Sequence, residues 1–252
     1  MIPAERQKKI LSIINQHELV SINKLTNELD VSHMTIRRDI AKLEKLGKVM
    51  SVSGGVQLCK LLHDESSHSE KSTQFSIQKK SIGHQASKMI PTGTIVYLDA
   101  GTTTLEIAHN IAYRNDLTVL TNDFAISDFL MRHGKCRLYH SGGNVDRNNH
   151  SCVGINVASF LQFFNIDIAF VSSSSWSLRG ISTPYEEKVV VKKAVIESSK
   201  KSVLVADSSK YGIVAAFHAL DIENFDLIVS DKDLPSSIIE ELTNKGIEVL
   251  AV

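Results

Sequence analysis

Apolar side chains recur every three or four positions over the first part of this 252-residue chain, which is the period of an amphipathic helix. Three stretches show this pattern, at residues 4–16, 21–30 and 32–47. Ser32 stands where a helix N-cap is expected, and Gly47 stands where a helix ends. The next residues alternate between apolar and polar and turn at Gly54 and Gly55, as a small hairpin does. Three short helices and a hairpin predict a winged helix-turn-helix over residues 1–58.

Residues 59–80 lose this period and are rich in serine, histidine and lysine. We expect them to form a linker, with room for a short helix. His63 and His68 could suggest a metal site, but a solvated linker is the simpler interpretation. The sequence therefore predicts a seam between two parts and no metal site at it.

From residue 81 to residue 252, short apolar runs alternate with helical stretches. The predicted strands lie within residues 94–100, 117–123, 136–143, 166–173, 202–209, 225–231 and 247–252. The predicted helices cover roughly residues 103–113, 123–133, 153–163, 186–200 and 235–245. Pro235 suits a first helical position, and Gly134 and Gly246 suit positions just past a helix end. Several runs are apolar throughout, as in parallel strands covered on both faces. The predicted fold class is α/β: an N-terminal winged helix-turn-helix, a linker, and an α/β domain over residues 81–252 with a mostly parallel sheet.

The composition excludes several classes of protein. No run of about 18 apolar residues exists, so neither a membrane span nor a membrane partner is expected. The N-terminus lacks the apolar core of a signal peptide. The cysteines are odd in number, far apart, and in neither disulfide nor metal spacing: Cys59, Cys136 and Cys152. We expect a cytoplasmic protein with no metal and no cofactor.

The net formal charge is zero, but the charge is unevenly spread. Residues 1–60 hold ten lysines and arginines and six acidic residues, which leaves +4. The remaining 18 basic and 22 acidic residues leave −4. A basic head on an acidic body favours a polyanionic partner for the head alone.

The third predicted helix turns Ile36 and Ile40 inward. Its opposite face combines arginine, lysine and hydroxyl side chains, which a helix in the major groove uses for base edges and phosphates. The candidate DNA-contacting residues are Ser32, His33, Met34, Thr35, Arg37, Arg38 and Lys42. A solvated charged face would explain this helix by itself. The two preceding helices and the hairpin favour double-stranded DNA as the partner.

Residues 6–49, and above all the stretch VSHMTIRRD from Val31 to Asp39, closely resemble the head of DeoR-family bacterial transcription regulators. The resemblance implies sequence-specific binding to operator DNA, usually as a repressor. The wing departs from the family pattern, because Ser51 and Ser53 stand where an arginine and a histidine are common. A strong phosphate contact from this wing is therefore not expected.

A candidate phosphate site lies where the first strand of the body ends. Gly101 allows a close backbone approach, and the threonines after it open a helix whose N–H groups and hydroxyls can hold an anion. Because the carboxyl ends of parallel strands meet at one edge of a sheet, polar residues after other strands should join them. The candidate effector-binding residues are Asp99, Gly101, Thr102, Thr103, Thr104, Thr121, Asn122, Gly142, Gly143, Asp207 and Lys210.

Several of these residues have a purely structural alternative. Asn122, or Asp123 beside it, could simply cap the following helix. The pair Gly142 and Gly143 could merely turn the chain. Asp207 could accept hydrogen bonds from sugar hydroxyls and Lys210 could neutralise a phosphate, or the two could pair with each other.

The body also resembles the DeoR-family sensor domain, through residues 79–104, LTVLTND, SGGNV and LVADSSKYG. The resemblance implies a fold similar to phosphosugar isomerases and a phosphorylated sugar or sugar acid as effector. The serine-rich loop 172–177 departs from the family pattern, with four serines followed by Trp176. It is either a surface loop with a half-buried tryptophan or a reshaped pocket whose hydroxyls suit a polyhydroxy ligand.

An isomerase-like enzyme with an accessory nucleic-acid-binding domain is the alternative to a regulator. Carboxylates for proton transfer exist at Asp99, Asp207, Glu186 and Glu187. No strong isomerase signature accompanies the phosphate loop, and a DNA-binding head gives the body a purpose without turnover. We therefore expect a repressor of a carbohydrate-catabolism operon rather than an enzyme. Since one small helix reads too few base pairs for a typical operator, we expect a homo-oligomer, either a dimer or a tetramer.

Overall fold

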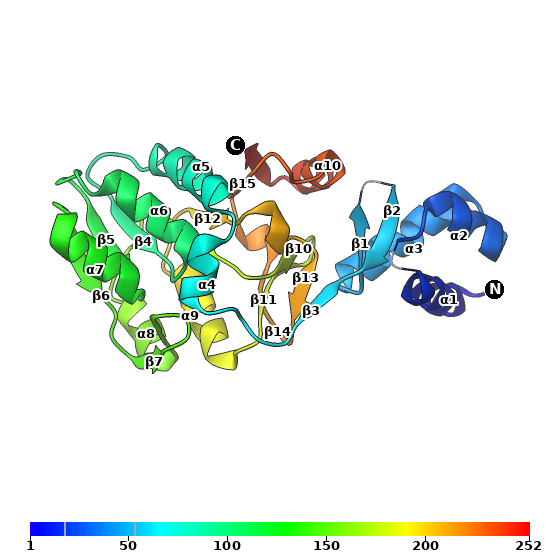
Figure 1. The fold of residues 1–252 in the computed structure, drawn as a ribbon, viewed down its shortest axis with the longest axis horizontal. Coiled ribbons are helices and arrows are strands. Elements are labelled where there is room, and N and C mark those ends of the chain that lie inside the picture. The colour runs from blue at the N-terminus through cyan, green and yellow to red at the C-terminus, as the bar shows by residue number, and fades with distance from the viewer. Residues whose placement is uncertain (18, 53) are drawn as a thin grey trace.

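The computed structural model describes residues 1–17, 19–52 and 54–252 and shows an elongated molecule with a small head and a larger body (Figure 1). The head contains α1 (Pro3–Gln16), α2 (Ile22–Leu29), α3 (His33–Lys45), β1 (Val49–Val52) and β2 (Gly55–Leu58). The two strands pair antiparallel and complete the predicted winged helix-turn-helix. Ser53, one of the two wing serines, lies outside the described residues.

The head is held together by one apolar core and by two buried acids on α3. The core takes side chains from all three helices and from the hairpin. The Asp39 carboxylate accepts a hydrogen bond from Arg6 of α1, and the Glu44 carboxylate accepts one from the Ser51 N–H of β1. Burial raises the pKa of Glu44. Ser32 caps α3 as predicted, through its side-chain oxygen. These contacts fix α3 on its inner side and leave its outer side free.

The body is built on a seven-stranded sheet in the order β16-β15-β12-β9-β4-β5-β6. Every pairing within it is parallel. Its strands are β4 (Ile95–Leu98), β5 (Thr118–Thr121), β6 (Arg137–His140), β9 (Ile168–Ser172), β12 (Ser202–Val205), β15 (Leu227–Ser230) and β16 (Glu248–Ala251). Each of these strands lies within one of the seven predicted runs, so the α/β prediction is confirmed.

Helices cover both faces of this sheet (Figure 1). One face packs against α5 (Ser76–Ser87), α6 (Thr102–Ile111) and α7 (Phe124–His133). The other packs against α8 (Ile155–Leu161), α9 (Glu186–Glu197) and α10 (Ser236–Asn244). Neighbouring strand residues therefore enter different cores: Val96 and Leu98 enter the first, and Tyr97 enters the second. This explains why the runs read as continuously apolar.

Smaller sheets lie outside the main one. A three-stranded antiparallel sheet joins β10 (Trp176–Ser177), β11 (Gly180–Thr183) and β14 (Phe217–Asp221). Two further pairs join β7 (Asn144–Asp146) with β8 (Ser151–Val153), and β3 (Lys60–Leu62) with β13 (Ile213–Ala215). Two short 3-10 turns, η1 (Ser208–Lys210) and η2 (Ile222–Asn224), follow β12 and β14.

Residues 59–80, expected as a linker, form regular structure packed on the body. They contain β3, the helix α4 (His68–Thr73), and the first turn of α5. A capping box starts α4, with Ser67 and Glu70 exchanging hydrogen bonds. The short helix for which this segment had room is present as α4. The rest of the segment is more regular than a solvated linker, since β3 pairs with β13, and its polar residues that face the body carry no apolar period. We call residues 59–75 the connector from here on.

Two helix-end predictions also need correction. Pro235 is the N-cap residue of α10 rather than its first helical residue. Gly134 is the C-cap residue of α7 with an extended backbone, whereas Gly246 follows the C-cap of α10 with a left-handed φ of 82°, as predicted. Within the described ranges, no helix combines the length and apolar content that crossing a membrane requires.

Candidate functional site

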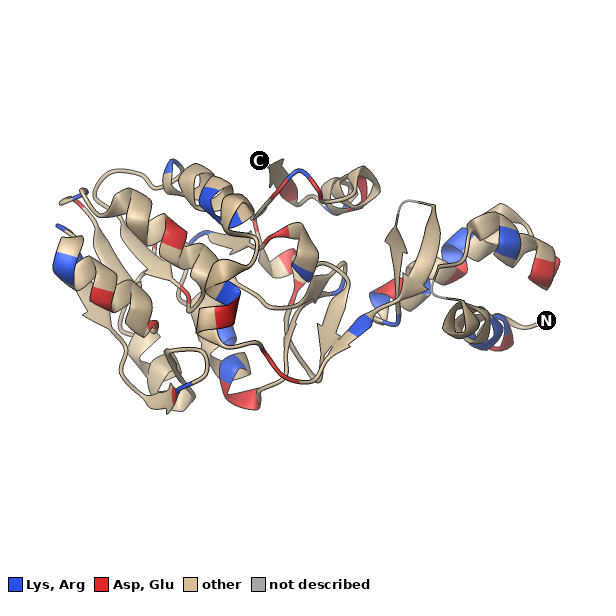
Figure 2. Ribbon diagram, in the orientation of Figure 1, with Lys and Arg blue, Asp and Glu red and all other residues tan. Residues whose placement is uncertain are grey.

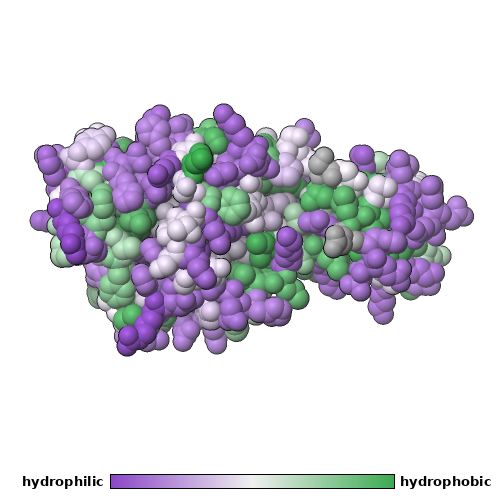
Figure 3. Space-filling model, in the orientation of Figure 1, coloured by the Kyte–Doolittle hydropathy of each residue, from purple (hydrophilic) through white to green (hydrophobic). Residues whose placement is uncertain are grey.

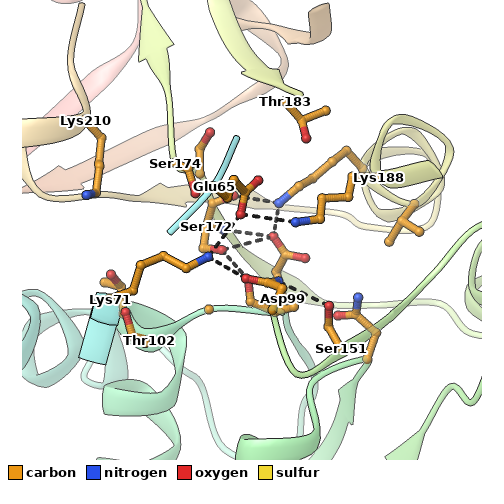
Figure 4. Close-up of a pocket in the computed structure, with 18 of the residues that line it drawn as sticks. Glu65, Lys71, Asp99, Thr102, Ser151, Ser172, Ser174, Thr183, Lys188 and Lys210 are labelled. Atoms are coloured by element: carbon orange, nitrogen blue, oxygen red, sulfur yellow. Dashed lines mark hydrogen bonds and ion pairs between the residues drawn. The ribbon is translucent and has the colours of Figure 1, made fainter. Parts of the chain in front are cut away.

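A cavity of about 710 Å³, including its open mouth, lies at the carboxyl ends of β4, β5, β9 and β12 (Figure 4). Seven of the predicted effector-site residues line it: Asp99, Gly101, Thr102, Thr103, Asn122, Asp207 and Lys210. They come together because the strands are parallel and end at one edge.

The cavity floor is the start of α6, directly after β4. Gly101 is the N-cap residue, with no side-chain cap among the described residues, so the first-turn N–H groups are free to face a ligand. Thr102 and Thr103 line the cavity. The glycine is needed for space, because a Cβ at position 101 would lie 2.6 Å from Ser172 Oγ. This arrangement, which we call the cradle (residues 101–103), can hold an anion by backbone donors and the positive helix end.

The sequence left two roles open for Asn122 and Asp123, a helix cap and a cavity residue, and each of the two residues takes one of them. Asp123 caps α7 by accepting from the Ile126 N–H at 2.8 Å, and it also accepts from the Gly101 N–H at 3.1 Å. Burial raises the pKa of Asp123 to about 7, with Asp99 nearby adding to the effect. Asn122 lines the cavity instead, and its side chain accepts from the Tyr97 hydroxyl at 2.8 Å.

Four predicted residues do not line the cavity. The Thr104 hydroxyl donates inward to the backbone oxygens of Asp99 and Gly101. Thr121 is buried and its hydroxyl accepts from a backbone N–H. Gly142 and Gly143 have φ values of 61° and 123° and turn the chain from the edge strand β6 into β7. The turn interpretation therefore describes the glycine pair.

Asp99 and Lys192 form a buried ion pair at the back of the cavity. The Asp99 side chain is 2% exposed, and it also accepts from the Ser172 N–H at 3.0 Å. The Lys192 ammonium group donates further to the Ser172 carbonyl at 2.6 Å. The Asp99 carboxylate is thus already bound by donors from α9 and from the end of β9. Glu186 and Glu187, at the start of α9, are exposed and do not line the cavity.

Removing the lysine of this pair should destabilise the fold. We expect Lys192→Met to lower the free energy of unfolding at neutral pH by about 3–5 kcal/mol, because Asp99 is left charged and buried without a partner. Urea denaturation gives the value. The double variant Asp99→Asn/Lys192→Met should recover most of the loss. A single variant as stable as the wild type would show that the pair is unimportant.

The connector supplies a second charged cluster to the cavity wall. Glu65 lies between two ammonium groups, 3.0 Å from that of Lys71 and 3.1 Å from that of Lys188 on α9. Figure 4 shows these lysines reaching Glu65 from different sides. Lys71 also donates to Asn149 and Lys188 pairs with Asp146. The cluster fastens the connector to α9 and to the loop between β7 and β8.

The pKa of Glu65 makes this fastening dependent on pH. Burial by itself would raise the pKa, but the lysines outweigh it and hold the pKa at about 2, from an ordinary 4.5. Burial lowers the pKa of Lys71, which offsets part of the gain. Because the folded pKa lies below the unfolded one, the stabilisation is complete above pH 4.5 and is lost as pH falls toward 2.

We therefore expect Glu65→Gln to cost about 2–3 kcal/mol of stability at pH 7 and progressively less below pH 4.5. The measurement is denaturant unfolding of both proteins from pH 7 to the lowest pH at which they fold. Glu240→Gln, on the exposed side of α10, is the control and should show no such trend. A stability difference that stays constant with pH would contradict the ionised state of Glu65.

Two lysines in the cavity remain without a carboxylate at ion-pair distance among the described residues: Lys79 and Lys210. Lys79 of α5 donates to the Lys71 carbonyl, and burial lowers its pKa, with Asp207 and Lys210 acting on it at longer range. The Lys210 ammonium group lies 5.7 Å from the centre of the Phe75 ring. Asp207 accepts from the Ser209 hydroxyl instead of pairing with Lys210. The Asp207–Lys210 pair that the sequence allowed is therefore not formed.

The charges around the cavity favour an anion. Five lysines and three carboxylates line it, which leaves two positive charges unmatched. Five of these eight charged residues were not among the predicted site residues: Glu65, Lys71, Lys79, Lys188 and Lys192. The polar Asn149 and Ser151 beside them were not predicted either. One signal was available. Lys188 and Lys192 stand four residues apart on the buried side of α9, where a lysine needs a partner.

The serine-rich loop also takes part in the cavity. Ser172, Ser173 and Ser174 line it. Trp176 is fully buried, in edge-to-face contact with Tyr211 at 4.9 Å between ring centres. Of the two alternatives for this loop, the half-buried surface tryptophan does not match the structure, because Trp176 lies in the core of the body. The Ser172 hydroxyl donates to the Ala100 carbonyl and the Ser173 hydroxyl donates to the Ser175 carbonyl, so the loop is held by its own hydrogen bonds where it lines the cavity.

At the other end of the molecule, α3 presents the predicted DNA-contacting residues. Ser32, His33, Met34, Arg37, Arg38 and Lys42 are exposed, and Thr35 is partly exposed. Figure 2 shows Lys and Arg positions along the head helices, and Figure 3 shows hydrophilic side chains over the outer end of the head. The inner face carries Ile36, Ile40 and Leu43 in the core. The helix α3 thus turns a basic face outward while its apolar face packs in the core of the head.

Comparison with known proteins agrees with this division of the chain. Residues 6–61 match the family described as the DeoR-like helix-turn-helix domain, and residues 74–232 match the DeoR C-terminal sensor domain. An uncharacterized HTH-type transcriptional regulator of Haemophilus influenzae is 50% identical over 100% of this chain and 98% of its own length. The HTH-type regulator YgbI of Escherichia coli K12 is 47% identical, over 99% of this chain and 98% of its own. The glycerol-3-phosphate regulon repressor of E. coli K12 is 27% identical, over 99% of each. The chain is a transcriptional regulator of the DeoR family.

Proposed function

We propose that this regulator is a repressor of a carbohydrate-catabolism operon and leaves its operator when a phosphorylated sugar or sugar acid binds the body. The observation that carries the proposal is the cavity with two unpaired lysines beside an uncapped helix N-terminus. The same chain presents an exposed basic face on α3. A site for an anionic metabolite and a face for DNA in one chain suit a regulator whose DNA binding responds to a metabolite.

The cavity offers different groups to different parts of such an effector. The cradle, Lys79 and Lys210 suit a phosphate, through oriented N–H donors and unmatched positive charge. Ser172, Ser173 and Ser174 suit the hydroxyls of the remaining chain. A related repressor is named for a glycerol-3-phosphate regulon, which supports a phosphorylated metabolite as the ligand class.

We also propose a homo-oligomer of at least two chains on the operator, because one recognition helix covers only a half-site. Residues 1–58 are proposed as the DNA-binding unit. The connector belongs with the sensing unit, because Glu65 and Lys71 line its cavity. The sensing unit would then start near residue 59 rather than 81.

Thermal unfolding with a panel of phosphorylated sugars, sugar acids and their unphosphorylated counterparts tests the effector class. Ligand at about 100 times its Kd stabilises by about 2.7 kcal/mol, which is a clear upward shift in Tm. Only the phosphorylated members should shift it. Operator titration with the active compound should then show weaker DNA binding. Stabilisation by unphosphorylated sugars alone would reject the phosphate site, and consumption of the compound would favour the isomerase-like enzyme.

A further inference from the structure

The strand pair β3–β13 connects both sides of the cavity to the head. β3 belongs to the connector and begins two residues after the hairpin strand β2. It runs parallel to β13, with Lys60 opposite Ile213 and Leu62 opposite Ala215. The Lys60 N–H also donates to the Gly212 carbonyl at 3.0 Å. The segments before β13 and after β3 both carry cavity residues.

On one side of the cavity, only a few residues separate the cavity lining from a contact with the head. Asp207 and Lys210 line the cavity, and Tyr211 and Gly212 follow at once. Gly212 has a φ of 75°, and a Cβ on it would lie 1.9 Å from Met50 Sδ. Met50 is part of the wing strand β1, yet it packs in the body core with Tyr211 and Trp176. Only a glycine with this backbone leaves room for the methionine.

On the other side, the connector leads from the head into the cavity. The Cys59 N–H donates to the Lys48 carbonyl of the head at 3.2 Å. Glu65, three residues after β3 ends, is clamped between Lys71 and Lys188 in the cavity wall. The head approaches β13 a second time beside this point. Gly47, just past α3, faces Val214, so that a Cβ built on Gly47 would lie 3.7 Å from the Val214 side chain. Figure 3 shows hydrophobic residues on the surface of the head beside its junction with the body.

We propose that effector binding reaches the recognition helix through this bridge, formed by β3, β13 and the contact of Met50 with Gly212. An anion drawn to Lys210 and the cradle moves η1, and with it Tyr211 and Gly212. Met50 then shifts β1, which holds α3 through the hydrogen bond between Ser51 and Glu44. The inference rests on the proposed function, since it names how that same site acts on the head. A ligand shifts the head only as far as it binds the two arrangements unequally.

Hydrogen exchange on the full chain tests the bridge, with inorganic phosphate as the probe and chloride at matched ionic strength as the reference. In the wild type, phosphate should slow amide exchange at the cradle and change exchange in β1 and α3. Met50→Ala should keep the cradle response and lose the head response. Val214→Ala, a milder change at the second contact, should reduce the head response and serves if the first variant does not fold.

Two controls separate the bridge from other effects. Leu61→Ala removes an exposed side chain of similar size from β3, and it should respond as the wild type does. Lys210→Ala should lose both responses, because it removes a charge of the anion site. A head response that persisted in this variant would come from phosphate acting directly on the basic helix. No cradle response in the wild type would reject the anion site itself, and the bridge with it. A cradle response without a head response, or an equal head response in Met50→Ala and Val214→Ala, would overturn the bridge alone.

Discussion

Arg38→Ala should weaken operator binding by about 1–3 kcal/mol, or roughly 5- to 150-fold, without changing the stability of the protein. The side chain is exposed on the outer face of α3, opposite the buried Ile36 and Ile40. If it reads a guanine, its loss should relax specificity at one position of the operator. If it touches phosphate only, binding should weaken on all sequences and the salt slope should fall by about one. Arg37→Ala should behave in one of the same two ways.

The measurement is operator titration at several salt concentrations, with thermal unfolding alongside it. Lys135→Ala is the matched control, because it removes one exposed positive charge from the body and should leave operator affinity unchanged. Operator affinity at the wild-type value in both arginine variants would show that another face of the head meets DNA. A fall in Tm that accompanies the loss would mean that the arginine supports the fold.

The second large effect is expected at the effector site. Lys210→Ala should keep operator binding and lose the release by metabolite, so that repression becomes permanent. Coupling between two sites is commonly worth about 1–3 kcal/mol, so the wild type should lose roughly 5- to 150-fold in operator affinity when the effector binds. The variant should lose close to none. Lys79→Ala should give a similar result, because it removes the other cavity lysine without an ion pair among the described residues.

Operator titration with and without the compound found by thermal unfolding provides the test. Lys200→Ala serves as control, since the Lys200 side chain is 72% exposed and its ammonium group pairs with Asp167 away from the cavity. Thr103→Val should act more mildly than the lysine variants, because the backbone donors of the cradle remain. If the Lys210→Ala variant leaves DNA at the same effector concentration as the wild type, Lys210 is not part of the effector site.

The main sheet could be predicted because its inner strands, such as β9, β12 and β15, are buried on both faces and read as unbroken apolar runs. The cradle could be predicted because a glycine and three threonines directly follow such a run. The lysines could not, because a polar side chain that faces a cavity has the same sequence pattern as one that faces bulk water. Lys71 and Glu65 lie in a stretch without apolar period, and Lys188, the second partner of Glu65, is far away in the chain. Only the folded arrangement of the connector brings them together.

The position of the connector limits where chimeric regulators can be made from this chain. A foreign head joined to this body at residue 80 would replace Glu65, Lys71 and Lys79 and leave the cavity without part of its wall. A junction at Cys59, between β2 and β3, keeps the cavity wall whole. It also separates Met50 from Gly212, so the new head would need a side chain of similar reach at the position of Met50. Chimeras that bind DNA but ignore their metabolite are the expected product when this fit is neglected.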